Sequence, residues 1–241
     1  MDLSTVKALG LSAVHILFPT VCMVCGRVLI VGDNCSQGLY EMNICTHCFS
    51  RFPIRDSGSR WFSCLSDPYE DDPISDFGVW TLFRYESPVT DLLRGLKFHS
   101  LQNAGELLGH VMGREFGEWY GQRADAVIPI PLSEKRKKKR GYNQASILGQ
   151  GIASYLDTPL LENVLVRVRH TKQQSRFSDP VRRELNIEGA FGVSETWDVT
   201  GWNIILVDDI LTTGATMHEA AKALVEKGAS SVVGVTCASH R

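Results

Sequence analysis

The sequence lacks a membrane-spanning segment and the excess of positive charge that is typical of nucleic-acid-binding proteins. The apolar stretch Leu9 to Phe18 is too short to span a bilayer and is followed by closely spaced cysteines instead of a small-residue cleavage site. We expect a helix there, without export or membrane insertion. The net charge of −2 gives no global positive field, so any contact with DNA or RNA has to be local. No internal repeat has a fixed period.

The number of cysteines excludes a disulfide framework that pairs every one of them within the chain. The chain has 7 cysteines, an odd number, and two C-x₂-C pairs account for four of them. Nineteen residues separate the two pairs, which is within the spacing typical of a four-thiolate zinc knuckle. We therefore predict a structural zinc site in a reducing compartment, the cytoplasm. Its ligands would be Cys22, Cys25, Cys45 and Cys48.

Alternatives for the cysteines stay open at this point. The four paired residues could form two redox dithiols or be ordinary half-buried thiols. His47 lies between Cys45 and Cys48 and could replace one ligand. Cys35, Cys64 and Cys237 stand alone, and Cys237 falls in an expected strand, where it would act as an apolar filler.

A composition shift predicts two domains. Residues 20–66 are rich in cysteine, glycine and short polar stretches, whereas the chain from about residue 76 alternates apolar strands with helical patterns. The stretch between them carries two prolines and four acids, which is typical of a linker. We predict an N-terminal helix and zinc module over 1–66, a linker over 67–75 and a larger domain over 76–241.

The larger domain has the pattern of an α/β fold. Strands alternating with helices predict crossover connections and a mostly parallel sheet with helices on both faces. In such sheets ligands bind at the carboxyl ends of the strands. The periodicity predicts strands over 77–85, 126–131, 204–207 and 231–238, and helices over 89–96, 104–112, 142–156 and 217–225.

Residues 205–216, ILVDDILTTGAT, form the most informative segment. An apolar strand ends on Asp208 and Asp209, which can hold the vicinal hydroxyls of a ribose. The turn that follows offers backbone N–H groups, threonine hydroxyls and a helix N-terminus, all of which favour a phosphate monoester. The alternative is an ordinary buried strand before an N-capped helix, with both aspartates capping or solvated. The residues of the turn are Thr212, Thr213, Gly214, Ala215 and Thr216.

This segment resembles the signature of the type I phosphoribosyltransferases, which bind 5-phosphoribosyl-1-pyrophosphate (PRPP). The resemblance implies that Asp208 and Asp209 contact the ribose 2′- and 3′-hydroxyls and that the loop from Thr212 to Thr216 holds the 5′-phosphate. It also implies displacement of pyrophosphate at C1 of the ribose, with Mg²⁺ bound to substrate oxygens.

Six consecutive cations, residues 135–140, follow the strand expected over 126–131. In a parallel sheet this loop can face the loop after Asp209, so its cations can neutralise the departing pyrophosphate. Arg136 and Arg140 are the candidates for that role. A solvated charged face, or a patch for single-stranded nucleic acid with Tyr142 as a stacking platform, are the competing interpretations.

Over nearly its full length the chain resembles the ComF family of competence-associated, phosphoribosyltransferase-like proteins. The motifs are the two C-x₂-C pairs, P-I-P-L followed by K-R and R-G-Y-N-Q over 129–144, R-x-R-x-T-x-x-Q over 167–174, and T-T-G-A-T. The polar stretch Arg167 to Asn186 resembles the mobile loop that closes over PRPP in related transferases. Many members carry a further C-x₂-C, where this chain has only Cys64.

Two functions follow from the resemblance. The first is a PRPP-dependent phosphoribosyltransferase with an unknown acceptor. The second is a non-catalytic factor of DNA uptake or natural transformation, in which the PRPP fold serves as a scaffold for single-stranded DNA or competence-machinery proteins. The sequence gives no oligomeric state.

Overall fold

The structure, a computed structural model, describes residues 19–63, 74, 77–96, 102–168 and 189–240. The predicted N-terminal helix, most of the predicted linker and most of the polar stretch after Arg167 lie outside these residues. The chain separates into two compact units, residues 1–52 and 53–241. This boundary falls earlier than the composition shift predicts, because the segment after residue 52 pairs with the large sheet: Ile54 bridges Phe83, and Trp61 pairs with Trp80.

The first unit consists of short elements around the cysteine pairs. Helix α2 spans Gln37–Glu41 and helix α3 spans Thr46–Phe49. The N-cap of α3 is Cys45, whose sulfur accepts a hydrogen bond from the backbone N–H of Cys48. Few apolar side chains are buried here, chiefly Leu29, Ile44 and Phe52.

The second unit contains a five-stranded sheet in the order β1-β2-β7-β6-β3, and a separate antiparallel pair, β4 and β5. The strands are β1 (Trp61–Ser63), β2 (Gly78–Arg84), β3 (Ala126–Pro129), β4 (Leu165–Arg167), β5 (Phe191–Val193), β6 (Asn203–Leu211) and β7 (Ser231–Ser239). Within the large sheet only β1 runs antiparallel to its neighbour. The carboxyl ends of β2, β7, β6 and β3 therefore share one edge.

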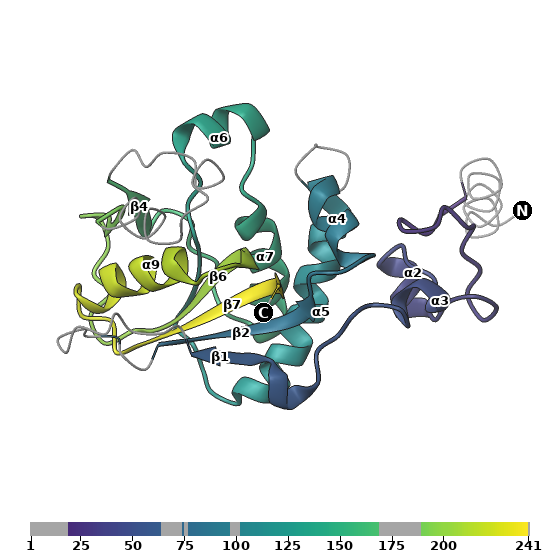
Figure 1. Cartoon of the computed structure of the whole chain (residues 1–241), viewed down its shortest axis with the longest axis horizontal. Helices are drawn as coiled ribbons and strands as arrows, with labels where there is room; N and C mark the ends of the chain where they lie inside the picture. The colour runs from purple at the N-terminus through teal and green to yellow at the C-terminus, as the bar shows by residue number, and fades with distance from the viewer. Residues whose placement is uncertain (1–18, 64–73, 75–76, 97–101, 169–188, 241) are drawn as a thin grey trace, which may run out of the picture. The chain divides into compact units, whose positions relative to one another are not determined.

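Helices cover both faces of this sheet (Figure 1). Side chains alternate along β6: Ile204 and Leu206 pack into a cluster with α9, whereas Val207 points toward α7. Both faces are thus apolar, as expected for a buried parallel strand. The helices of this unit are α4 (Val89–Gly95), α5 (Gln102–Tyr120), α6 (Glu134–Arg140), α7 (Gln144–Leu156) and α9 (Ala215–Val225).

Helices α5 and α7 pack closely because glycines face each other at their crossing. A Cβ atom on Gly151 would lie 2.5 Å from the carbonyl carbon of Gly109, and one on Gly109 would lie 2.5 Å from the carbonyl oxygen of Leu148. The backbones can approach this closely only without side chains. No helix within the described ranges is both long enough and apolar enough to cross a bilayer.

The mostly parallel sheet flanked by helices, predicted from the sequence, is confirmed. Two local expectations need correction. The basic run is not a loop but the helix α6, capped by Gly141 in the left-handed conformation at φ 78°. The acidic pair does not follow β6 but lies within it, because β6 continues to pair with β7 as far as Leu211 and Ser239.

Candidate sugar-phosphate site

Asp208 and Asp209 lie near the carboxyl end of β6, and both are half-buried. Asp208 is in register with Thr236 of β7, and its Oδ1 accepts a hydrogen bond of 2.8 Å from the backbone N–H of Asp209. The two side chains leave the strand toward opposite faces of the sheet, as successive residues of a strand do. Pairing with β7 nevertheless holds the backbone of both acids in place. The rigid strand therefore fixes the position of both carboxyl groups.

The environment favours the neutral form of one of these acids. Burial raises the pKa of Asp208 to about 8, and the negative charge of Asp209 acts in the same direction. The guanidinium of Arg167 opposes this rise. Near neutral pH the pair therefore keeps a proton, so it can both donate to and accept from sugar hydroxyls.

Arg167 interacts electrostatically with Asp208. Its Nε donates a 2.9 Å hydrogen bond to the carbonyl oxygen of Pro131, and its guanidinium lies 4.6 Å from the centroid of the Phe191 ring. Burial lowers the pKa of Arg167, while the charge of Asp208 partly offsets that effect. These contacts connect β4 with the loop after β3 and with β5, and the charge of Arg167 also acts on Asp208.

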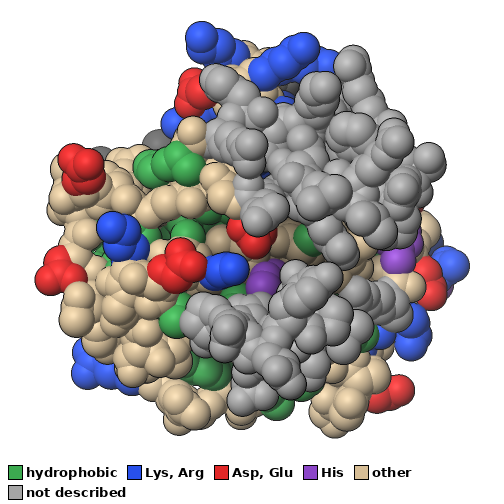
Figure 2. Space-filling model, turned by 60° about the vertical axis from the view of Figure 1, so that its left-hand side comes forward, with side chains coloured by type: hydrophobic (Ala, Val, Ile, Leu, Met, Phe, Trp, Pro, Cys, Tyr) green, Lys and Arg blue, Asp and Glu red, His purple; other side chains and the backbone are tan. Residues whose placement is uncertain are grey.

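Because the basic run forms the helix α6, its residues differ in how far they are buried. Arg136 and Arg140, four residues apart, are half-buried, whereas Lys135, Lys138 and Lys139 are exposed. Burial lowers the pKa of Arg140, as does the neighbouring charge of Arg136, and Asp209 counteracts both. The two arginines predicted from the sequence therefore share an electrostatic environment with the acidic pair. Figure 2 shows Lys and Arg side chains gathered at the top of the molecule, where α6 lies in Figure 1.

The turn after β6 has the geometry expected of an anion-binding loop. Gly214 is the N-cap of α9 with φ 97°, a conformation that favours glycine, and its carbonyl accepts from the N–H of His218. Thr213 Oγ1 accepts a 3.4 Å hydrogen bond from the N–H of Ala215. The positive end of α9 thus faces the turn, which favours a bound phosphate.

The four paired cysteines of the first unit come together. Their sulfur atoms all lie within 4.8 Å of one another, and Cys25 and Cys45 are 3.9 Å apart. Tetrahedral zinc with Zn–S bonds of about 2.3 Å requires sulfur separations near 3.8 Å. Four sulfurs without an open position fit a structural ion such as zinc, and the backbone N–H of Cys45 donates to the Cys22 sulfur at 3.4 Å.

The charge state of these sulfurs is uneven without an ion. Burial raises the pKa of Cys22, but hydrogen bonds from backbone N–H groups outweigh it and bring the pKa to about 7. Burial and the neighbouring sulfurs raise the pKa of Cys48. Within the described residues, the cluster includes neither His47 nor Cys35. Cys237 is fully buried in β7, as expected for an apolar filler.

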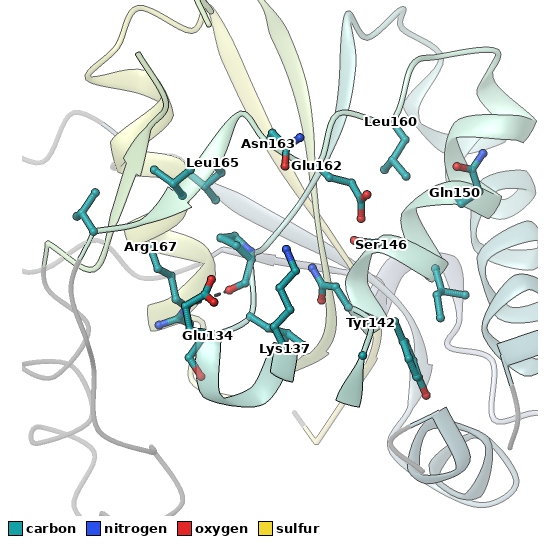
Figure 3. Close-up of a pocket in the computed structure, with 18 of the residues that line it drawn as sticks. Glu134, Lys137, Tyr142, Ser146, Gln150, Leu160, Glu162, Asn163, Leu165 and Arg167 are labelled. Atoms are coloured by element: carbon teal, nitrogen blue, oxygen red, sulfur yellow. Dashed lines mark hydrogen bonds between the residues drawn. The ribbon is translucent and has the colours of Figure 1, made fainter. Parts of the chain in front are cut away.

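A cavity of about 620 Å³ lies beside the acidic site and does not contain the acids (Figure 3). Its walls come from the loop after β3, from α6, from the start of α7 and from residues 160–168. Arg167 lines it and also interacts electrostatically with Asp208. The sequence reasoning missed this cavity, because residues such as Ser146 and Glu162 belong to no motif. It also missed the electrostatic interaction of Arg167 with Asp208; the position of Arg167 at the end of the short apolar strand β4 is the signal that could have revealed it.

Comparison with known proteins agrees with these features. Residues 139–241 match the family model described as "Phosphoribosyl transferase domain". The chain is 28% identical to "Competence protein F" of Haemophilus influenzae, over 88% of this chain and 93% of that protein. It is 31% identical to "Competence protein ComFC" of Bacillus subtilis, over 64% of this chain and 60% of the relative. It is 27% identical to "DNA utilization protein YhgH" of Escherichia coli O157:H7, over 89% and 94%.

The fold of the second unit is that of the type I phosphoribosyltransferases, and the cysteine cluster of the first unit is compatible with a zinc module. Sequence motifs, fold and relatives point to the same group of proteins. The relatives named for competence and DNA utilization, together with the matched phosphoribosyl transferase domain, support assignment of the chain to the ComF family of phosphoribosyltransferase-like proteins.

Proposed function

We propose that this chain binds PRPP with Mg²⁺ and transfers the phosphoribosyl group to an acceptor, releasing pyrophosphate. The observation that carries the proposal is the acidic pair on β6, a strand that leads into a turn with a left-handed glycine and a helix N-terminus. Half-buried arginines share the electrostatic environment of the pair. A pentose phosphate matches this arrangement, because its hydroxyls suit the acidic pair and its phosphate suits the turn before α9.

The acidic pair would orient the sugar. Asp208 and Asp209 hold the 2′- and 3′-hydroxyls, and the turn from Thr212 to Thr216 holds the 5′-phosphate against the positive end of α9. Because the acids lie in a paired strand, little reorganisation is needed when the ribose binds. The bound sugar then presents C1 in a fixed orientation.

The arginines would stabilise the negative charge of the leaving group. The bond from C1 to the pyrophosphate oxygen breaks, both of its electrons leave with pyrophosphate, and a nucleophilic atom of the acceptor bonds to C1. Arg136 and Arg140 would stabilise this developing charge. Mg²⁺, when bound with the substrate, would offset further charge on the phosphate oxygens.

Calorimetry with PRPP and Mg²⁺ tests the pocket. Asp208→Asn and Asp209→Asn should each weaken binding about 10- to 100-fold, because the amide cannot reproduce the hydrogen bonds that the carboxyl group makes with the sugar hydroxyls. Asp157→Asn, at the exposed end of α7, is the matched control and should bind like the wild type. Equal binding by all three variants would remove the acids from the site. Pyrophosphate release with a panel of bases then tests turnover.

A second candidate is a non-catalytic scaffold for single-stranded DNA in DNA uptake. It is favoured by the exposed lysines of α6 and by the names of the relatives. Because lysines that neutralise phosphates release counterions, binding through them depends on salt. PRPP binding without turnover, together with retention on single-stranded DNA, would support this function.

Charge reversal at Lys135, Lys138 and Lys139 tests the scaffold. The slope of log affinity for single-stranded DNA against log salt should fall by about 2, which corresponds to three lost phosphate contacts. The control carries the same three charge reversals at exposed cations elsewhere, Arg94, Arg123 and Lys227. If both triple variants lose affinity equally, the α6 surface is not the binding face.

A further inference from the structure

The cavity beside α6 combines charges of opposite sign on separate walls. Lys137 reaches into it from α6, and Glu162 reaches into it from the segment before β4 (Figure 3). Neither side chain forms an ion pair with any described residue. An open cavity that presents an ammonium and a carboxylate separately suits a ligand with an anionic end and a hydrogen-bond donor at a distance from it.

The part of the cavity near Glu162 combines apolar walls with polar groups, which suits an aromatic ring that carries hydrogen-bonding atoms. Leu160, Leu165 and Ile147 supply apolar walls. Ser146 lines the cavity from α7, and its Oγ is buried and has no hydrogen-bond partner among the described residues. A buried hydroxyl without a partner is costly, and a ligand atom that bonds to it removes that cost. Figure 3 shows Glu162 and Ser146 directed toward the same region.

From this arrangement we propose that the cavity binds a nucleoside 5′-monophosphate whose base carries an exocyclic amine. The phosphate lies against Lys137. The amine donates to Glu162, a ring nitrogen accepts from Ser146 Oγ, and the ring packs on the leucines. The volume of about 620 Å³ is within the range for ligands of this size. The α-ammonium and α-carboxylate of a free amino acid share one carbon and cannot serve separate walls, so only an amino acid with a second carboxylate, such as glutamate, competes with a nucleotide for this cavity.

This site does not depend on the proposed PRPP chemistry. Neither acid of β6 and no residue of the turn 212–216 lines the cavity. Helix α6 serves both places with different residues: Arg136 and Arg140 share the environment of the acids, and Lys137 reaches the cavity. The two binding events can therefore be measured separately.

Equilibrium dialysis tests the proposal in the Asp208→Asn/Asp209→Asn double variant, so that nucleotide held by the sugar-phosphate site does not contribute. The probes are 5′-dGMP, 5′-dAMP, 5′-dCMP, 5′-dTMP, deoxyguanosine and glutamate. At least one amine-bearing monophosphate should bind, and dTMP and deoxyguanosine should each bind about tenfold more weakly, as expected for one lost charge-assisted contact. In the same background, a 5′-phosphorylated oligonucleotide distinguishes a free nucleotide from the end of a DNA strand.

Single substitutions assign the contacts. Lys137→Ala should remove the preference for dGMP over deoxyguanosine, and Glu162→Gln should remove the preference for amine-bearing bases over dTMP. Ser146→Leu, which fills the cavity, should abolish binding. Lys139→Ala, on the same helix but outside the cavity, is the control and should change nothing. Failure of every monophosphate to bind, equal binding of glutamate, or an equal loss in Lys139→Ala and Lys137→Ala would overturn the proposal, whatever the PRPP result.

Discussion

The two units of this chain keep their folds by different means. In the first, the described core consists mainly of cysteine sulfurs with Leu29, Ile44 and Phe52, while valines such as Val21 and Val28 stay exposed. In the second, a sheet with apolar side chains on both faces is packed between helices. The contrast teaches that a small unit with little apolar burial gathers cysteines that can bind a metal ion, whereas a large unit can hold destabilising polar groups at its site.

That second point is visible in the acidic pair. Asp208 and Asp209 are adjacent, half-buried and mutually repulsive, and burial raises the pKa of Asp208. A strand built only for stability would carry apolar residues there. The core around β6 offsets the cost of keeping two acids at the sheet edge.

Removing the metal is expected to have the largest effect, and only in the first unit. Chelation or Cys45→Ser should unfold residues 19–52, since binding of a structural zinc is worth about 10–16 kcal/mol and few apolar side chains replace it. Limited proteolysis and zinc analysis measure the loss. Cys35→Ala is the control, because Cys35 is buried but outside the cluster. Resistance of the chelated first unit to protease would mean that apolar packing suffices.

Adding one methyl group between α5 and α7 is expected to destabilise only the second unit. The new Cβ in Gly151→Ala would lie 2.5 Å from the Gly109 carbonyl carbon and 2.6 Å from the His110 nitrogen, both backbone atoms. Overpacking of this kind costs about 2 kcal/mol. Urea denaturation measures the free energy of unfolding. Gly58→Ala has no atom within 4 Å of its new Cβ and should match the wild type.

The acidic pair is expected to make the second unit less stable as the pH rises. Asp208 titrates near 3.8 when unfolded and near 8 when folded, so between these values unfolding releases a proton and the free energy of unfolding falls with rising pH. Asp208→Asn removes this dependence and should gain about 1–3 kcal/mol at pH 8 after allowance for partial exposure, with no gain at pH 4.

Asp198→Asn provides a control of opposite sign. Hydrogen bonds with Thr200 lower the pKa of Asp198, so its ionised form stabilises the fold above pH 4. The variant should therefore lose stability at pH 7 relative to the wild type. Thermal melts at several pH values measure both variants, and a pH profile of Asp208→Asn identical to that of the wild type would contradict the assigned role of burial.

Much of this architecture could be predicted from the sequence, because its signals are local. Apolar runs and helical spacing predicted β2, β3, β6, β7 and the helices around them, and the C-x₂-C spacing predicted the cysteine cluster. The short strands β1, β4 and β5, three residues each, were not predicted, because such short segments have no period of their own. Only the tertiary structure defines them.

The site was predictable where one segment carries it. Asp208 and Asp209 stand beside the turn in the chain, and Arg136 and Arg140 were chosen from the basic run. The role of Arg167 requires β4 to lie near β6, and the cavity requires α6, α7 and residues 160–168 together. The basic run was predicted as a loop because six consecutive cations show no alternation of polar and apolar residues. The helix becomes recognisable only in the structure, where Arg136 and Arg140 are half-buried and the lysines are exposed.

The smallest expected effect is the difference between replacing a half-buried arginine and replacing an exposed lysine of α6. Arg136→Ala removes a half-buried charge from the environment of Arg140 and Arg167, so affinity for PRPP with Mg²⁺ should fall about tenfold, near 1.4 kcal/mol. Lys138→Ala removes an exposed charge of the same helix and should change the affinity less than twofold, or about 0.4 kcal/mol, because solvent and salt screen it. Calorimetry at two salt concentrations distinguishes them: the Arg136 effect should persist in high salt. If both variants lose affinity equally and salt removes the loss, α6 acts as a diffuse charge and its half-buried arginines have no specific role.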